Sequence, residues 1–159
     1  MVSAIKPSFA ANTFLVGTVI DAGASQKKEP KITLFCFEIS DSQLQNVAST
    51  DIVKPGFSSI LQILRIPQAG KDASKNPKEY VLLAGVSSIF VLLHKSRSFT
   101  QIHCFENVHM GPISDLLFET FSIISVSSTE AKVVVIKANE NLIKAEACAK
   151  TIALKVQEK

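Results

Sequence analysis

The order of apolar and polar residues predicts short strands joined by tight turns. The clearest stretch, Val108 to Lys137, contains three β-rich runs separated by turns of two or three residues. Runs of Val, Ile, Phe and Ser between such turns are the layout of a β-meander. This stretch therefore predicts a small up-and-down antiparallel sheet.

The same rhythm occurs earlier in the chain. The run Lys31–Ile39 is apolar on both faces, which predicts a strand that is covered on both sides. The more polar run Gln43–Ser49 predicts a weaker strand at an exposed edge. Residues Met1–Asn12 are expected to be an irregular lead-in, because Pro7 interrupts regular structure. Gly17, inside the next run, is expected at a bulge or a close contact.

Repetition of these rounds predicts a single all-β domain, residues 1–159, built of about three propeller-like blades of antiparallel meanders. Ile60 and Ile113 are matched positions in two rounds and lie 53 residues apart. Without part of the long loop in the second round, this spacing approaches the period of about 40 to 45 residues of propeller blades. The tail 139–159 fits either a helix or further strands. The approximate blades are residues 13–55, 56–107 and 108–150.

Three blades are too few for a closed propeller, which usually has about four to eight. Blades need neighbours on both sides, and doubly apolar strands would otherwise leave large apolar faces in water. We therefore expect an incomplete propeller that is completed by another chain or by the rest of a longer parent, unless the sheet closes in a different way.

Composition narrows the class of protein without indicating a reaction. An apolar share of 47% is typical of a folded chain, and a net charge of +3 is too small to indicate nucleic-acid binding. Cys36, Cys104 and Cys148 are odd in number and far apart, so we expect reduced, buried thiols in a cytoplasmic or nuclear protein. The longest apolar run is far shorter than the roughly 18 residues of a membrane span, and the first residues lack a secretory pattern.

No group of residues indicates a catalytic, cofactor or metal site. His103, Cys104 and His109 are metal-ligand types, but adjacent strand residues point to opposite faces and zinc needs four ligands. Ser114, Asp115 and His109 are the residue types of a hydrolase triad, without a nucleophile elbow around the serine. We therefore expect no enzyme activity, no cofactor and no bound metal.

Two basic loops are candidate contact sites for an acidic partner, although solvated lysines are the commoner explanation. The aromatic residues are mostly Phe inside strands, which argues against stacking on RNA bases. The candidate loop residues are Lys27, Lys28, Lys71, Lys75 and Lys78.

The segment from Val108 to Lys137 resembles a WD repeat. A blade of that family has a His before its inner strand, as His109 lies before Pro112–Phe118. Its second strand carries Ser and small residues, which the run around Ser125 resembles, and its tight turn carries an acid, which Glu130 resembles.

The third strand of the family ends in Trp-Asp, where this chain has Ile136-Lys137. The resemblance therefore implies that the buried network of His, Ser and Asp in this family is only partly present. The structural blade positions that it implies are His109, Asp115, Ser125 and Glu130.

The resemblance implies a non-catalytic scaffold for protein–protein interaction, a subunit of a hetero- or homo-oligomer that shares blades. A weaker likeness covers more of the chain. Leu82–Val91 and His109–Asp115 are similar to the closing blades of the propeller exchange factors that load coat-assembling small GTPases. That likeness implies an alternative function, the regulation of a small GTPase in membrane trafficking. An enzyme or ligand-binding barrel is a third hypothesis without a supporting residue set.

Overall fold

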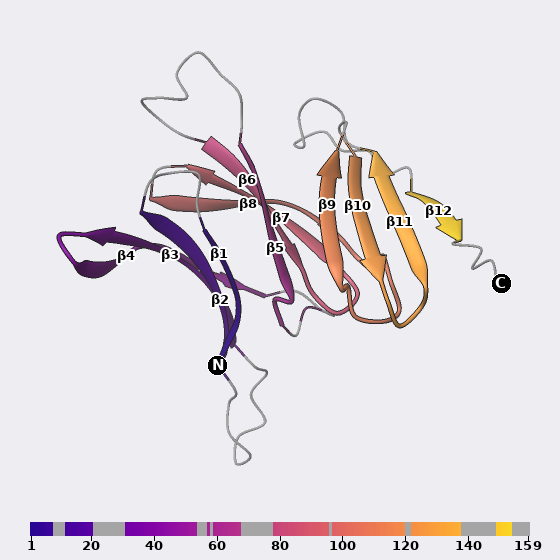
Figure 1. Ribbon diagram of the computed structural model, residues 1–159, viewed down its shortest axis with the longest axis horizontal. Helices are drawn as coiled ribbons and strands as arrows, with labels where there is room; N and C mark the ends of the chain where they lie inside the picture. Colours follow the sequence, from indigo (N-terminus) through magenta and orange to yellow (C-terminus); the bar gives the residue numbers. More distant parts are fainter. Residues whose placement is uncertain are drawn as a thin grey trace.

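A computed structural model describes residues 1–7, 12–20, 31–53, 57, 59–67, 78–95, 97–119, 122–137 and 149–153. These residues form twelve strands and no helix (Figure 1). The strands make three antiparallel sheets of four strands each. The predicted all-β fold of propeller-like blades is therefore confirmed.

Each sheet is a meander of strands that follow one another in the sequence. The first sheet contains β1 (Val2–Pro7), β2 (Thr13–Ile20), β3 (Lys31–Ser40) and β4 (Gln43–Ile52). The middle sheet contains β5 (Gln62–Pro67), β6 (Lys78–Ala84), β7 (Ile89–Lys95) and β8 (Ser98–Phe105). The last sheet contains β9 (Asp115–Glu119), β10 (Ser122–Ser127), β11 (Lys132–Lys137) and β12 (Ala149–Ala153).

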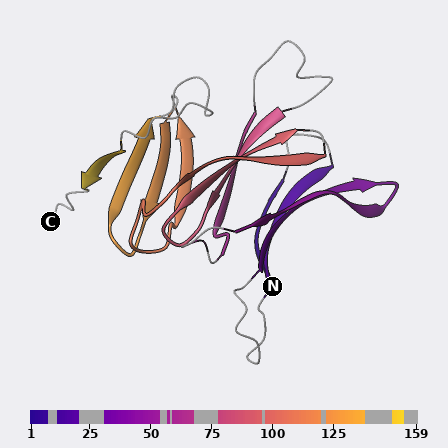
Figure 2. The same ribbon diagram turned by 180° about the vertical axis from the view of Figure 1, so that it is seen from behind.

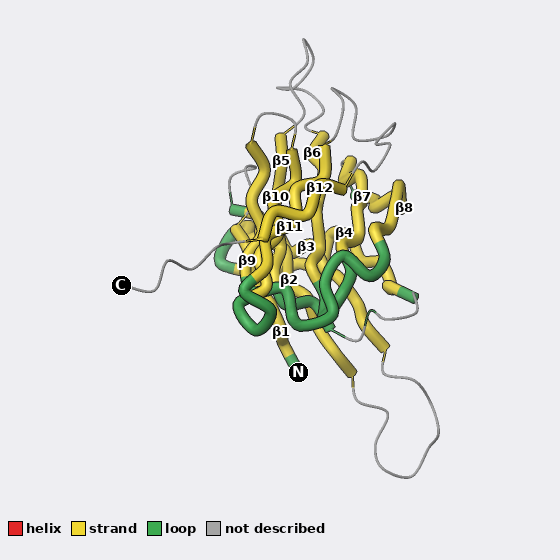
Figure 3. Tube along the Cα trace, turned by 90° about the vertical axis from the view of Figure 1, so that its right-hand side faces the viewer, coloured by secondary structure: helices red, strands yellow, loops and turns green. Residues whose placement is uncertain are grey.

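The three sheets lie in a row, with the middle sheet between the other two (Figures 1 and 2). Figure 3 looks along this row, with the last sheet toward the viewer. The first strands of neighbouring sheets approach one another, β1 against β5 and β5 against β9. We call β1, β5 and β9 the inner strands.

Two apolar cores hold the row together, one on each face of the middle sheet. The core between the first and middle sheets includes Leu15, Leu34, Ile60, Val81 and Leu92. The core between the middle and last sheets includes Leu82, Val91, Ile113, Ile123 and Ile136. Alternate residues of β6 and β7 therefore enter opposite cores, as the period of two along a strand requires.

The start of the chain differs from the expectation. Val2–Pro7 forms β1, so the prediction of an irregular lead-in is wrong for these residues. Most side chains of β1 are exposed and give little apolar signal. Pairing with β2 holds the strand, together with the bond from the Val19 N–H to the Met1 carbonyl (2.9 Å). Pro7 ends the strand, where a missing N–H costs no ladder bond.

Several other expectations agree with the structure. The polar strand β4 lies at the edge of the first sheet. Ile60 and Ile113 lie just before β5 and β9, and both are almost fully buried. Gly17 lies at a close contact with Ile60, just before β5. In the tail, residues 149–153 form a strand, whereas residues 138–148 and 154–159 lie outside the described residues.

Candidate functional site

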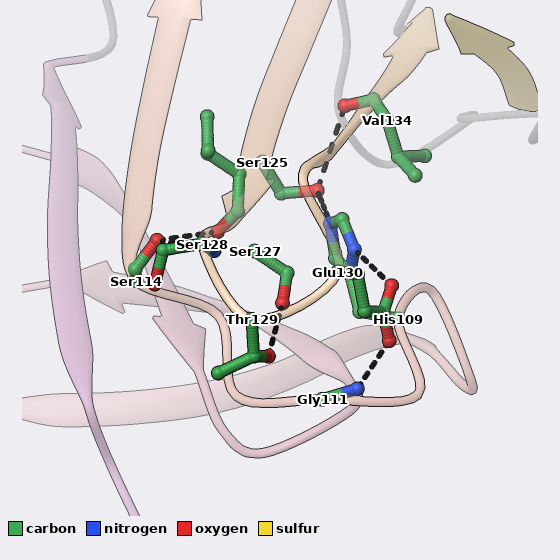
Figure 4. Close-up of polar contacts among 10 residues, drawn as sticks. His109, Gly111, Ser114, Ser125, Ser127, Ser128, Thr129, Glu130 and Val134 are labelled. Carbon is green, nitrogen blue, oxygen red and sulfur yellow. Dashed lines mark hydrogen bonds and ion pairs between the residues drawn. The ribbon is translucent and has the colours of Figure 1, made fainter. Parts of the chain in front are cut away.

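A buried polar network joins the loop before β9 to strand β10 and to the turn after it (Figure 4). His109 Nε2 lies 3.0 Å from Ser125 Oγ, and His109 Nδ1 lies 3.2 Å from Glu130 Oε2. The other carboxylate oxygen of Glu130 accepts a hydrogen bond from the Gly111 N–H. His109 and Ser125 are 1% and 0% exposed. The structure therefore joins three of the four blade positions that the WD resemblance implies, His109, Ser125 and Glu130, in one network.

The pKa of Glu130 lies below its ordinary value. Partial burial pushes this pKa upward, but hydrogen bonds from the Gly111 N–H and from His109 outweigh that effect. The resulting carboxylate can only accept hydrogen bonds, so Nδ1 of His109 carries a proton toward it. The Ser125 hydroxyl has one proton, and both His109 Nε2 and the Val134 carbonyl lie within hydrogen-bond distance of it.

The order Ser125, His109, Glu130 is the hydrogen-bond order of a serine hydrolase triad. A nucleophile, however, must be reached by a substrate, and Ser125 is fully buried. Its hydroxyl faces the Val134 carbonyl at 3.5 Å on the neighbouring strand β11. The network therefore ties the loop, β10 and the turn together inside the last sheet.

The residues of the hydrolase triad considered from the sequence, Ser114, Asp115 and His109, do not form a connected network. Ser114 Oγ donates to the Val126 carbonyl (3.1 Å) and accepts from the Ser128 N–H (3.2 Å). Asp115 is exposed at the start of β9, and its carboxylate accepts from the Leu116 N–H. Ser114 and Asp115 thus stabilise local backbone, and Asp115 contributes nothing to the His109 network.

The remaining sequence candidates divide into described and undescribed residues. Cys36 and Cys104 form no disulfide; Cys36 is buried and Cys104 is partly buried. Cys148 and four of the candidate lysines, Lys27, Lys28, Lys71 and Lys75, lie outside the described residues. Lys78 begins β6, and its side chain is likewise not described.

A second polar cluster, which the sequence did not predict, lies on the face of the middle sheet that packs on the first sheet. Arg65 on β5 donates from Nε to Glu79 Oε2 of β6 (2.8 Å), and its Nη2 contacts Oε1. His94 Nδ1 on β7 lies 2.7 Å from the same Oε1. The His94 ring also stacks on Phe99 of β8 with centroids 4.5 Å apart. One ion pair and its histidine thus link all four strands.

This cluster is charged although it is buried. Burial alone would raise the pKa of Glu79. Hydrogen bonds from His94 and Arg65 outweigh this effect, so the pKa lies below its ordinary value. Among the described residues, Arg65 Nη1 and His94 Nε2 have no hydrogen-bond partner. Burial also raises the pKa of the neighbouring Cys36 thiol, which the positive charge of Arg65 partly offsets.

The far side of the last sheet carries an apolar surface that no described element covers. We call this surface the trailing face, and its residues alternate with those that enter the core. One cross-strand row is Leu117–Ile124–Val135, and the next contains Val126 and Val133. Leu117 is 50% exposed and the other four are partly exposed. The trailing face therefore comprises Leu117, Ile124, Val126, Val133 and Val135.

The far side of the first sheet carries a second uncovered apolar surface, which we call the leading face. It comprises Ile5, Phe14, Phe35 and Phe37 around Val16, which is itself 7% exposed. Phe37 stacks on Phe14 and on Phe35, with centroids 5.8 Å and 5.7 Å apart. Ile5 is 62% exposed. Both ends of the row of sheets are thus apolar.

Within the described residues, no group of three or more His, Cys, Asp or Glu side chains could hold a metal ion. The same part of the chain has no helix suited to crossing a membrane. No protein-family profile matches the chain, and no curated protein matches it significantly.

Proposed function

We propose that this chain is a non-catalytic interaction scaffold of the β-propeller type, which works with further sheets packed on its ends. Its action is to hold other proteins, and its partners contribute or complete blades. The observation that carries the proposal is the pair of apolar end surfaces, the leading and trailing faces.

The middle sheet carries a comparable apolar row that is covered by a neighbouring sheet. Its row Leu64–Leu82–Val91 consists of branched aliphatic residues, as does the row Leu117–Ile124–Val135 of the trailing face. In the middle sheet this row packs against the last sheet, and Leu82 and Val91 are almost fully buried. The equivalent row of the trailing face is exposed to water. This supports the binding of a further sheet there, because burying the row would remove apolar area from water.

The His109 network supports a divergent WD-type blade for the last sheet. The positions implied by that resemblance, His109 before the inner strand, Ser125 on the second strand and Glu130 in the tight turn, are in contact. Ile136 of the Ile-Lys end instead enters the apolar core. In this proposal a polar network and core packing together stabilise the blade.

A photo-crosslinking experiment tests the proposal. A photoreactive amino acid replaces Leu117 or Ile5 in the full-length protein within its native cells, and adducts are identified by mass spectrometry. We expect protein adducts at both positions. Lys95 and Gln101, which are exposed at other places on the molecule, are the matched control positions.

Equal yields of adducts at the end-face positions and at the control positions would contradict the proposal. So would a purified particle in which Leu117 and Ile5 stay accessible to solvent in hydrogen–deuterium exchange and labelling, while the cellular protein runs as a monomer.

A further inference from the structure

The alignment of the middle and last sheets fixes which residues of the trailing face are equivalent to covered ones. The Leu61 N–H donates to the Ala84 carbonyl, and the Ser114 N–H donates to the Val126 carbonyl, both at 2.8 Å. Counting from these bonds, Leu117 is equivalent to Leu64. The same bonds fix the remaining pairs of equivalent residues, which are Ile124 with Leu82, Val126 with Ala84, Val133 with Ile89 and Val135 with Val91.

The trailing face is therefore shaped to pack on the front of another sheet. In this chain the front of a sheet is the side that faces the preceding sheet, such as the row Ile63–Leu83–Phe90 of the middle sheet. The one front that remains uncovered among the described residues is the leading face. It offers apolar rows in the same arrangement, including Ile5–Val16–Phe35.

The leading and trailing faces of one molecule do not meet. The middle sheet separates the first sheet from the last, and each of its two faces is already occupied by a core. Figures 1 and 2 show the first and last sheets on opposite sides of it. Among the described residues, neither face is therefore covered by the other.

Resting on the proposed function, we propose that the occupant of both faces is a second copy of this chain, bound head to tail. The trailing face of each copy packs on the leading face of the other. Two copies then contribute twice three sheets, and the resulting ring lies within the usual range of about four to eight blades. The pair has twofold symmetry, and ring closure leaves neither apolar end exposed.

Leu117 and Ile5 are expected to meet at the inner edge of each contact. Both lie on inner strands, where the neighbouring sheets of this chain approach each other, as the first two sheets also do at the outer strands β4 and β8. Both side chains are exposed by half or more, so a lysine at either position can be solvated in the monomer. Leu117→Lys and Ile5→Lys are therefore suitable probes.

The purified full-length chain is measured by light scattering and native mass spectrometry at micromolar concentration. We expect twice the chain mass of 17.2 kDa. Each single variant, Leu117→Lys or Ile5→Lys, is expected to be a monomer. In a pair of identical variants, the substituted face takes part in both contacts, so both contacts are weakened. An equimolar mixture of the two variants is expected to form a heterodimer through one intact trailing face and one intact leading face.

Different failures have different meanings. If Ile5→Lys stays dimeric while Leu117→Lys is monomeric, like faces pair and the head-to-tail contact is wrong. If the wild-type chain is monomeric but Leu117 crosslinks to another protein, the second copy is wrong and the scaffold proposal stands. A monomer without crosslinks overturns both.

Circular dichroism melts establish that each variant folds. If a variant fails to fold, crosslinking in the wild-type background decides instead. A photoreactive residue at Leu117 is then expected to join peptides from β1 to β3 of the other copy. Crosslinks confined to β9–β12 would overturn the proposal.

Discussion

Gly17 of β2 packs directly against Ile60 at the start of the middle sheet. A methyl group placed on Gly17 would lie 2.9 Å from Ile60 Cδ1 and 3.0 Å from Ile60 Cβ. Ile60 is fully buried in the core between the first two sheets. The absence of a side chain at Gly17 therefore lets these two sheets approach closely.

We expect Gly17→Ala to lower the free energy of unfolding. The smaller backbone entropy of Ala in the unfolded chain favours folding by about 0.4 to 1 kcal/mol. Overpacking a core costs about 1 to 3 kcal/mol, so the clash should dominate. Urea unfolding at fixed chain concentration measures the change.

The matched control is Gly17→Ala combined with Ile60→Val, which removes the Cδ1 atom that the new methyl group meets. The double variant should be more stable than the sum of the two single effects predicts. Strict additivity would show that the contact with Ile60 Cδ1 is not the cause.

Ser125→Ala is expected to lower the free energy of unfolding by about 1 to 3 kcal/mol, because it leaves the buried His109 Nε2 without its partner. Ser98→Ala is the control, since its hydroxyl bonds the Lys95 carbonyl at an exposed site. Surface substitutions of this kind usually stay within about 0.5 kcal/mol. Equal effects of the two substitutions in urea unfolding would argue against a stabilising His109 network.

Glu130 should contribute to the acid dependence of stability. Its pKa is lowered in the folded chain, whereas an unfolded Glu titrates near about 4.3. The stabilisation is therefore complete above the unfolded pKa, and it is lost as the pH falls through the folded pKa. In Glu130→Gln this loss is absent, so the difference in stability from wild type should shrink on acidification.

Thermal melts between neutral and acidic pH measure this difference. Glu79 also has a lowered pKa, so part of the acid destabilisation should remain in Glu130→Gln. Glu106→Gln, at an exposed turn, serves as the control. A difference from wild type that stays constant down to acidic pH would contradict the assignment.

Arg65→Leu should be among the most destabilising single changes in the middle sheet. It leaves the buried Glu79 charge without its bidentate partner, which typically costs about 3 to 5 kcal/mol. Arg65→Leu combined with Glu79→Leu should recover part of that loss, because the paired apolar replacement leaves neither an Arg nor a Glu charge unpaired, while His94 loses its bond to Glu79. Urea unfolding of the double-mutant cycle measures the coupling, and simple addition of two large losses would contradict it.

Much of the fold could be predicted from local pattern. Strand β3 illustrates why: Leu34 enters a core while Phe35 lies on the leading face, so the central stretch 34–37 of the strand is apolar on both faces. The sequence predicts such strands from their apolar pattern alone. It missed β1, because this strand is held by backbone pairing and its side chains are mostly exposed.

The polar sites differ in how far the sequence could predict them. Glu130 lies in a tight turn between two clear strands, so its role followed from a short segment with a known resemblance. The cluster of Arg65, Glu79 and His94 joins residues on three strands, and only the strand register brings them together. A usable signal existed, since each replaces an apolar residue at a core-facing position of its strand.

The meander order of each sheet has a consequence for the history and synthesis of the chain. All four strands of a sheet come from one uninterrupted stretch, and each strand bonds to its nearest neighbours in sequence. A stretch can therefore complete its own ladder of backbone bonds soon after it leaves the ribosome. For the same reason, duplicating one stretch in a gene lengthens the row by a whole unit while every existing ladder is kept.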